Sequence, residues 1–144
     1  MTDLENTFFE SYKKLDKYLC DMYSCTSGVT KYIEDMENTA DGRYYVGNWD
    51  DDYKTLKHLR WIRTQIAHDT GDSFCEQEDL YALQSLYRRF FELDNPMAQY
   101  RKAEKKLQLL SNRKRNCVWK KTCGRMGDSF NCNSNFGVRV FEVF

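Results

Sequence analysis

An arginine and a histidine near the end of one amphipathic segment carry side chains suited to phosphate chemistry. Arg63 and His68 are separated by four residues within the run 59–69. A guanidinium stays charged at every physiological pH and binds phosphate through two parallel hydrogen bonds. An imidazole exchanges protons near neutral pH. These residue types at this spacing predict action on a phosphate group, most simply that of RNA.

The neighbours of Arg63 on a helix predict where its side chain lies. Three and four positions away stand Leu59, Arg60, Ile66 and Ala67. Most of these are core-type residues, so we expect Arg63 on or beside the buried stripe, where a guanidinium needs an anionic partner. One alternative is an internal ion pair with an Asp or Glu. The other is that both arginines extend along apolar surface to the helix edge.

His68 shares a face with Arg63 only if the helix ends or distorts between them. Five positions on a regular helix turn about 140° and advance about 7.5 Å. The alternative reading of His68 is a residue at a helix C-terminus, where it interacts favourably with the helix dipole. Asp69 would then cap the helix locally or orient the imidazole.

The segment resembles the signature of HEPN domains, small helical-bundle proteins of prokaryotic toxin–antitoxin and defence systems. Their motif is an arginine, four to six residues and a histidine at the end of a central helix, and Arg63 to His68 matches it, with Ala67 before the histidine. The flanking Leu59 and Ile62 look similar, and the likeness extends to the helical layout of roughly residues 1–110. It departs at Thr64, where asparagine is most frequent.

The resemblance implies an RNA-cleaving or RNA-binding protein, a metal-independent endoribonuclease without a cofactor. His68 would act as general acid or base and Arg63 would hold the scissile phosphate, with Thr64 and Asp69 in supporting positions. Such groups contribute about 10²–10⁴ in rate through proton transfer, with added electrostatic stabilisation. The family further implies a homodimer and an antitoxin partner protein.

Two other classes of function remain open. The first is a non-catalytic helical interaction module, a HEPN-fold binding protein in which Arg63 forms a structural ion pair. The second is a nucleotide sensor, in which the aromatic residues Tyr44, Tyr45 and Trp49 of the turn-rich segment 38–49 line a pocket. Packing beneath that loop is the alternative role of these rings.

The zero net charge hides an asymmetry along the chain. Residues 1–100 hold 11 Lys and Arg against 19 Asp and Glu, whereas residues 101–125 hold 10 Lys and Arg against one Glu. A concentrated basic segment with Trp119 within it is typical of a surface that follows a phosphate backbone while a ring stacks on a base. A solvated helix face is the alternative. The predicted nucleic-acid-binding residues are Lys105, Lys106, Arg113, Lys114, Arg115, Lys120 and Lys121.

Apolar residues at helical spacing predict the elements that carry these groups. They recur in the segments 4–22, 29–36, 53–66, 80–93 and 97–110. Capping-box patterns start at Thr2 and at Ser73, and Asn95 with Pro96 starts the last helix. We therefore predict an all-α, up-and-down bundle of about five helices, HEPN-like, over residues 1–112. Residues 113–144 form a basic, Cys-containing extension, with residues 117–119 and 138–144 pairing as a short β-hairpin.

Composition and cysteine spacing argue against a membrane protein, a secreted protein and a zinc protein. No stretch approaches the roughly 18 apolar residues of a membrane span, and the acidic start lacks an apolar signal region, so we expect a cytoplasmic protein. The 6 cysteines include no Cys-x-x-Cys pair, and their spacing fits no usual zinc site. We therefore predict reduced thiols and no metal.

Overall fold

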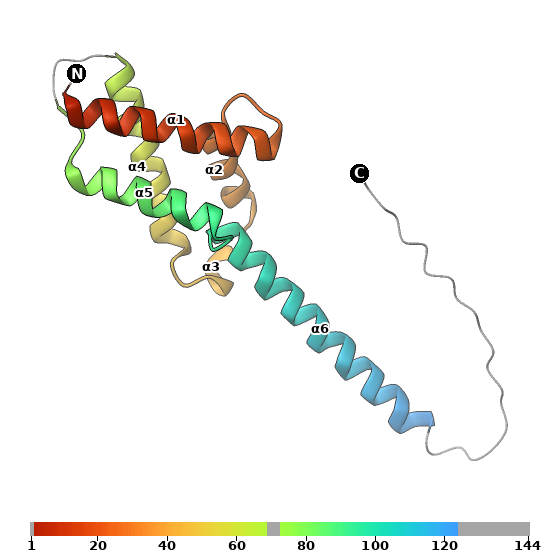
Figure 1. Ribbon diagram of the computed structural model, residues 1–144. Coiled ribbons are helices and arrows are strands. Elements are labelled where there is room, and N and C mark those ends of the chain that lie inside the picture. Colours follow the sequence, from red (N-terminus) through yellow and green to blue (C-terminus); the bar gives the residue numbers. More distant parts are fainter. Residues whose placement is uncertain (1, 69–72, 124–144) are drawn as a thin grey trace. The chain divides into compact units, whose positions relative to one another are not determined.

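The computed structural model describes residues 2–68 and 73–123, with side chains as far as Arg115, and every regular element in this part is a helix. The long helices are α1 (Asp3–Tyr23), α2 (Gly28–Asn38), α4 (Trp49–His68), α5 (Gln77–Phe91) and α6 (Pro96–Cys123), and α3 (Gly42–Tyr45) is a single turn (Figure 1). The predicted fold class, an all-helical bundle of about five helices, is confirmed.

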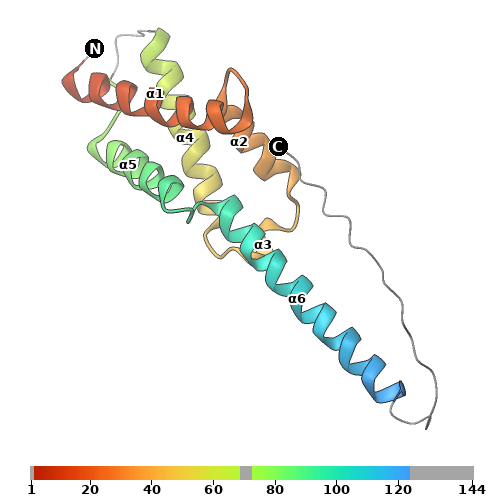
Figure 2. The same ribbon diagram turned by 45° about the vertical axis from the view of Figure 1, so that its right-hand side comes forward.

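Four helices enclose one apolar core. α1 packs on α2, α5 and α4, and α2 also packs on α4. In both views α4 crosses α1 (Figures 1 and 2). The predicted stripes supply the buried residues, since each amphipathic face buries its apolar side against the others. The largest fully buried side chains are Phe8, Leu15, Leu19, Tyr32, Ile33, Met36, Leu56, Leu59, Ile62, Leu83 and Phe90.

The caps explain where the helices begin. Thr2 and Glu5 form the predicted capping box at α1, with Thr2 Oγ1 accepting from Glu5 N–H at 3.2 Å. The box predicted at Ser73 is wrong, because α5 begins only at Gln77, behind a box formed by Glu76 and Asp79. The intervening residues are not helical, and Cys75 among them is buried in the core.

The chain divides into two compact units, Met1–Leu107 and Gln108–Phe144, and the division falls within α6. Within the first unit, Met97 is buried and Tyr100 packs against the rings of Tyr45 and Trp49. Leu107 and Leu110, predicted as core, are 45% and 47% exposed.

The strand predicted for residues 117–119 is wrong, because these residues continue α6. Once a helix has formed, each added residue gains a backbone hydrogen bond at little cost, whereas a lone strand gains none. Its predicted partner, residues 138–144, lies outside the described residues. α6 also runs without a break through the predicted boundary between residues 112 and 113, which stays a prediction. None of the described helices is long and apolar enough to cross a membrane.

Candidate functional site

Two faces of α4 carry the residues singled out by the sequence. Arg60, Arg63 and Thr64 lie within one turn of each other, on a stretch that borders α1 and the start of α2. His68 is the last residue of α4. It lies on the same side of the helix as Trp61, because seven positions bring a helix nearly back to the same direction. α4 stays helical through His68, so Arg63 and His68 of one chain point in different directions.

The arginine face lines a pocket of about 200 Å³, hereafter the arginine pocket. It is built by α1, by the turn after it with the start of α2, and by α4. Its lining is almost entirely polar and consists of Tyr12, Asp16, Thr26, Ser27, Thr30, Arg60, Arg63 and Thr64. His68 is not part of this lining.

Arg63 is exposed, which agrees with the alternative of a position at the helix edge and not with an internal ion pair. The buried stripe passes through Leu59, Ile62 and Ile66, and Arg63 follows Ile62 by about 100°, enough to bring it to the edge of the stripe. Its guanidinium lies over the Phe9 ring, 5.8 Å from the centroid. Among the described residues it forms no ion pair within 4.0 Å, so the expected structural ion pair is not found there.

Tyr12 is the buried member of the arginine pocket, with only 5% of its surface exposed. Its hydroxyl takes part in none of the hydrogen bonds among the described residues, in which every fully buried side-chain oxygen has a partner. The hydroxyl must therefore reach accessible space, and the arginine pocket is the space that Tyr12 lines. Burial raises the pKa of this phenol, the charge of Asp16 raises it further, and the charges of Arg63 and Arg60 lower it. The phenol thus stays protonated and can donate.

The start of α2 forms another wall of the arginine pocket. Asp16 Oδ1 accepts from Val29 N–H at 2.9 Å, and Cys20 Sγ accepts from Gly28 N–H at 3.1 Å. Side chains of α1 therefore cap α2, while its own N-cap residue, Ser27, makes no capping hydrogen bond. Positive charge accumulates at a helix start, and the first turn of α2 contains no carboxylate.

The predicted supporting residues contribute less than expected. The Thr64 hydroxyl donates to the Arg60 carbonyl oxygen at 3.0 Å, so its proton is already used within α4. His68 is exposed and forms no hydrogen bond with the described residues. Asp69, expected to orient the imidazole, lies outside those residues.

The second histidine is more organised than the predicted one. His58 Nε2 lies 3.0 Å from Asp79 Oδ1 at the start of α5. The His58 ring stacks on Trp61, with centroids 5.9 Å apart and planes at 17°. Phe74 packs edge-on against Trp61, with centroids 5.5 Å apart. Trp61 nevertheless remains 46% exposed. The face that carries His68 is therefore aromatic rather than cationic.

The basic segment presents its charges to solvent. Of the predicted nucleic-acid-binding residues, those with described side chains are all exposed, namely Lys105, Lys106, Arg113, Lys114 and Arg115. Arg115 donates to the Asn112 side chain on the same helix. The side chains of Lys120 and Lys121 lie outside the described residues. An exposed series of like charges on one helix suits contact with a polyanion.

The aromatic loop divides between packing and exposure. Trp49 is 5% exposed and packs on Tyr100, whereas Tyr44 is 79% exposed. A pocket of about 240 Å³ opens here, lined by residues of α2, α3 and α4 that include Arg43 and Asp50. Trp49 is part of its lining, and this pocket shares no lining residue with the arginine pocket.

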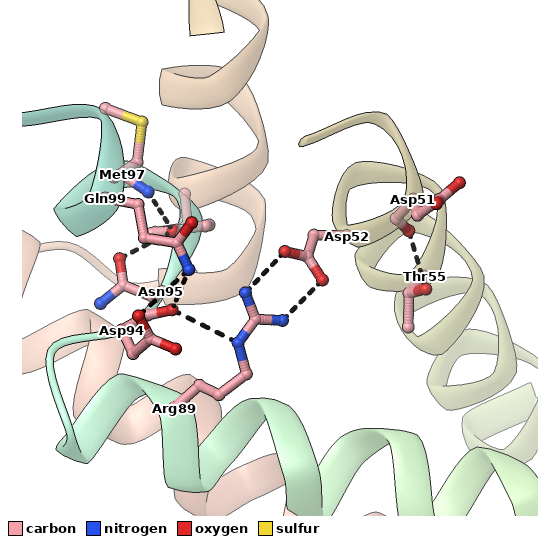
Figure 3. Close-up of polar contacts among 9 residues, drawn as sticks. Asp51, Asp52, Thr55, Arg89, Asp94, Asn95, Met97 and Gln99 are labelled. Atoms are coloured by element: carbon pink, nitrogen blue, oxygen red, sulfur yellow. Dashed lines mark hydrogen bonds and ion pairs between the residues drawn. The ribbon is translucent and has the colours of Figure 1, made fainter. Parts of the chain in front are cut away.

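An ion pair inside the bundle escaped the sequence reasoning. Asp52 stands in the first turn of α4, where the helix dipole alone favours a carboxylate. It is nevertheless 8% exposed and accepts two hydrogen bonds from Arg89 of α5, at 2.7 and 2.8 Å (Figure 3). The hydrogen bonds that Arg89 donates to Asp52 raise the pKa of the guanidinium. Spacing along either helix gives no signal for this pair, because its partners are 37 residues apart.

A buried polar cluster joins α2 to the start of α6 beside this pair. The Tyr32 hydroxyl donates to Asn95 Oδ1 at 3.0 Å and accepts from Met97 N–H at 3.1 Å. Asn95 Oδ1 also accepts from Ala98 N–H at 3.1 Å, which confirms Asn95 as the predicted cap of the last helix. These contacts hold the bundle together and leave no group free for chemistry.

Comparison with known proteins places the chain in a family. The family of unknown function DUF6548 matches residues 6–135. This range covers all of the helical bundle except the first residues of α1, and it includes the arginine pocket and the basic segment. No curated protein and no solved structure matches the chain. The chain therefore belongs to the family of unknown function DUF6548.

Proposed function

We propose that this protein binds RNA and that the arginine pocket holds a phosphate of the RNA backbone. The observation that carries the proposal is the pair of guanidiniums of Arg60 and Arg63, which border one polar pocket without a carboxylate within ion-pair distance among the described residues. Guanidiniums bind phosphate oxygens through charge-assisted, often bidentate hydrogen bonds. The Tyr12 hydroxyl supplies a further donor from the pocket's buried wall.

The charges of the arginine pocket favour a phosphodiester over a free phosphate. Arg60 and Arg63 bring two positive charges, and Asp16 brings one negative charge that interacts with the start of α2. The remaining single positive charge matches a phosphodiester, which carries one negative charge, better than a dianionic phosphate. Hydroxyls of Thr26, Ser27 and Thr30 offer partners for a ribose 2′-hydroxyl, the group by which proteins distinguish RNA from DNA.

The basic segment supports the same proposal independently. Its exposed lysines and arginines would bind a polyanion through counterion release, which is strong, salt-dependent and indifferent to sequence. The arginine pocket would then contribute a localised contact, whereas α6 would contribute affinity. We expect RNA binding to weaken steeply as salt concentration rises.

Exchanging both arginines for glutamine should weaken RNA binding about 10-fold to 100-fold, because each charge-assisted hydrogen bond contributes about 1.5–3 kcal/mol before partial compensation. The measurement is the fluorescence anisotropy of a labelled single-stranded RNA with Arg60→Gln/Arg63→Gln. Arg43→Gln/Arg88→Gln is the matched control, since it removes the same charge from exposed positions outside the arginine pocket. Equal weakening by both double substitutions would mean that only net charge, and not the arginine pocket, affects RNA binding. An unchanged Kd for Arg60→Gln/Arg63→Gln would refute the role of the arginine pocket.

His68→Ala separates RNA binding from the cleavage implied by the HEPN resemblance. Because His68 lies outside the arginine pocket, we expect its removal to leave RNA affinity within about twofold. Incubation of labelled RNA with the wild type and with His68→Ala, in the presence of a chelator, tests the nuclease reading. Cleavage by the wild type that falls about 10²–10⁴-fold in the variant, with the fold retained, would favour the metal-independent ribonuclease. It would also require that a second copy bring its histidine to Arg63.

A further inference from the structure

The turn between α1 and α2 carries two cysteines whose spacing follows from the way α1 ends. Ser24 adopts the left-handed conformation, with φ 52° and ψ 46°, and its N–H donates to the Cys20 carbonyl oxygen. Cys25 N–H donates to the same oxygen at 3.2 Å. This hydrogen bond, from the sixth residue back to the first, is the one that defines a Schellman ending, in which the side chains at these two positions are frequently neighbours. Those two positions are Cys20 and Cys25.

The backbone holds the two residues at a distance that a disulfide can span. Because the Cys25 nitrogen and the Cys20 oxygen are 3.2 Å apart, covalent geometry limits the separation of the two Cα atoms to about 7 Å. Disulfides join Cα atoms about 4.4–6.8 Å apart. Both cysteines are free and partly exposed, so a small oxidant can reach them.

We propose that Cys20 and Cys25 form a reversible disulfide that braces the turn between α1 and α2. The proposal does not depend on RNA binding, although Thr26 and Ser27, which follow Cys25, line the arginine pocket. The juxtaposition of the two thiols by the helix ending carries the inference. A disulfide of this kind modifies one wall of the arginine pocket without rearranging the core.

The surroundings of the Cys20 thiol set the order of the two thiol–disulfide exchange steps. Burial raises the pKa of the Cys20 thiol, and its bond from Gly28 N–H only partly offsets this. Because Cys20 Sγ is held by Gly28 N–H at 3.1 Å, the first attack is assigned to Cys25. With oxidised glutathione as the oxidant, the Cys25 thiolate attacks one sulfur of the glutathione disulfide and releases one reduced glutathione. Cys20 then loses its proton and attacks the Cys25 sulfur, releasing the second, so that both electrons pass to glutathione.

Trypsin provides a direct test on the full-length wild-type protein. Cleavage after Lys17 and Lys31 releases one peptide that contains Cys20 and Cys25 and no other cysteine. After equilibration with reduced and oxidised glutathione, acid quenching and alkylation, we expect this peptide to be unalkylated and lighter by two hydrogen atoms. Dithiothreitol should restore the doubly alkylated form. Recovery of only the doubly alkylated peptide, or of Cys25 linked to another peptide of the chain, would overturn the proposal.

Cys75 is the internal control within the same digest. It is buried, and burial raises the pKa of its thiol to about 11, so it should not react with glutathione while the protein is folded. In Cys25→Ser the loss of two hydrogen atoms must vanish, and at most a glutathione adduct on Cys20 should remain. Closing this short loop should also raise the Tm of the oxidised wild type by about 5 °C, with no such rise in Cys25→Ser. An equal rise in both would mean that the bridge forms elsewhere.

Discussion

Asp52→Asn is expected to lower the free energy of unfolding by about 3 kcal/mol, because it leaves the Arg89 guanidinium inside the bundle without its counter-charge. The two hydrogen bonds at 2.7 and 2.8 Å are charge-assisted and bidentate. The side chains of Arg89 and Asp52 are 19% and 11% exposed, so the expected cost lies at the lower end for buried pairs. Urea unfolding followed by circular dichroism measures it.

Asp51→Asn is the matched control for this loss. Asp51 stands beside Asp52 in the first turn of α4, but its side chain is exposed. Both substitutions remove one negative charge from the helix start, which by itself is worth about 0.3–1 kcal/mol. A difference of less than about 1 kcal/mol between the variants would mean that the ion pair contributes little beyond that dipole effect.

Replacing both partners should recover much of the stability. Asp52→Leu combined with Arg89→Met exchanges two charges for apolar groups of similar size, and such exchanges of buried pairs are often neutral or stabilising. We therefore expect the double variant to unfold at a higher urea concentration than Asp52→Asn. A double variant as unstable as the single one would indicate that the site needs polar groups for a reason other than charge balance.

Gly28→Ala is expected to destabilise the bundle by about 3 kcal/mol, because the added methyl group would overlap backbone atoms that cannot move independently. A Cβ at this position would lie 2.4 Å from the Asp16 carbonyl oxygen and 2.4 Å from the Cys20 nitrogen. α2 would have to separate from α1, and the capping bonds to Gly28 and Val29 would lengthen. RNA affinity should fall as well, since Ser27 and Thr30 flank this residue in the arginine pocket.

Gly47→Ala provides the contrast. No atom lies within 4 Å of a Cβ built at Gly47, and its backbone is compatible with alanine. The substitution should be neutral, or stabilise by up to about 1 kcal/mol through a less flexible unfolded chain. Thermal unfolding of the two variants side by side separates a local clash from a general intolerance of alanine. A Gly28→Ala protein as stable as Gly47→Ala would show that α2 does not need its close approach to α1.

The sequence alone was sufficient to predict the helices and most of the core. Apolar residues at spacings of three and four identified the buried faces of α1, α2, α4 and α5, because a helix can bury only one stripe of its surface. The cap at Thr2 and the cap at Asn95 were also predicted correctly. Such features depend on residues close in sequence, and their outcome varies little with the rest of the fold.

Tertiary structure decided which polar groups meet. Leu59 and Ile66 placed Arg63 on or beside the buried stripe, which left an internal ion pair and the helix edge both open. In the structure the guanidinium lies at the edge, over Phe9. The buried ion pair instead joins Asp52 to Arg89, whose spacing in the chain carries no signal. The arginine pocket likewise needs Tyr12, Ser27 and Arg60 from three separate segments. Local periodicity determines which side of a helix is apolar, whereas the partners of a charged side chain depend on which helices cross near it.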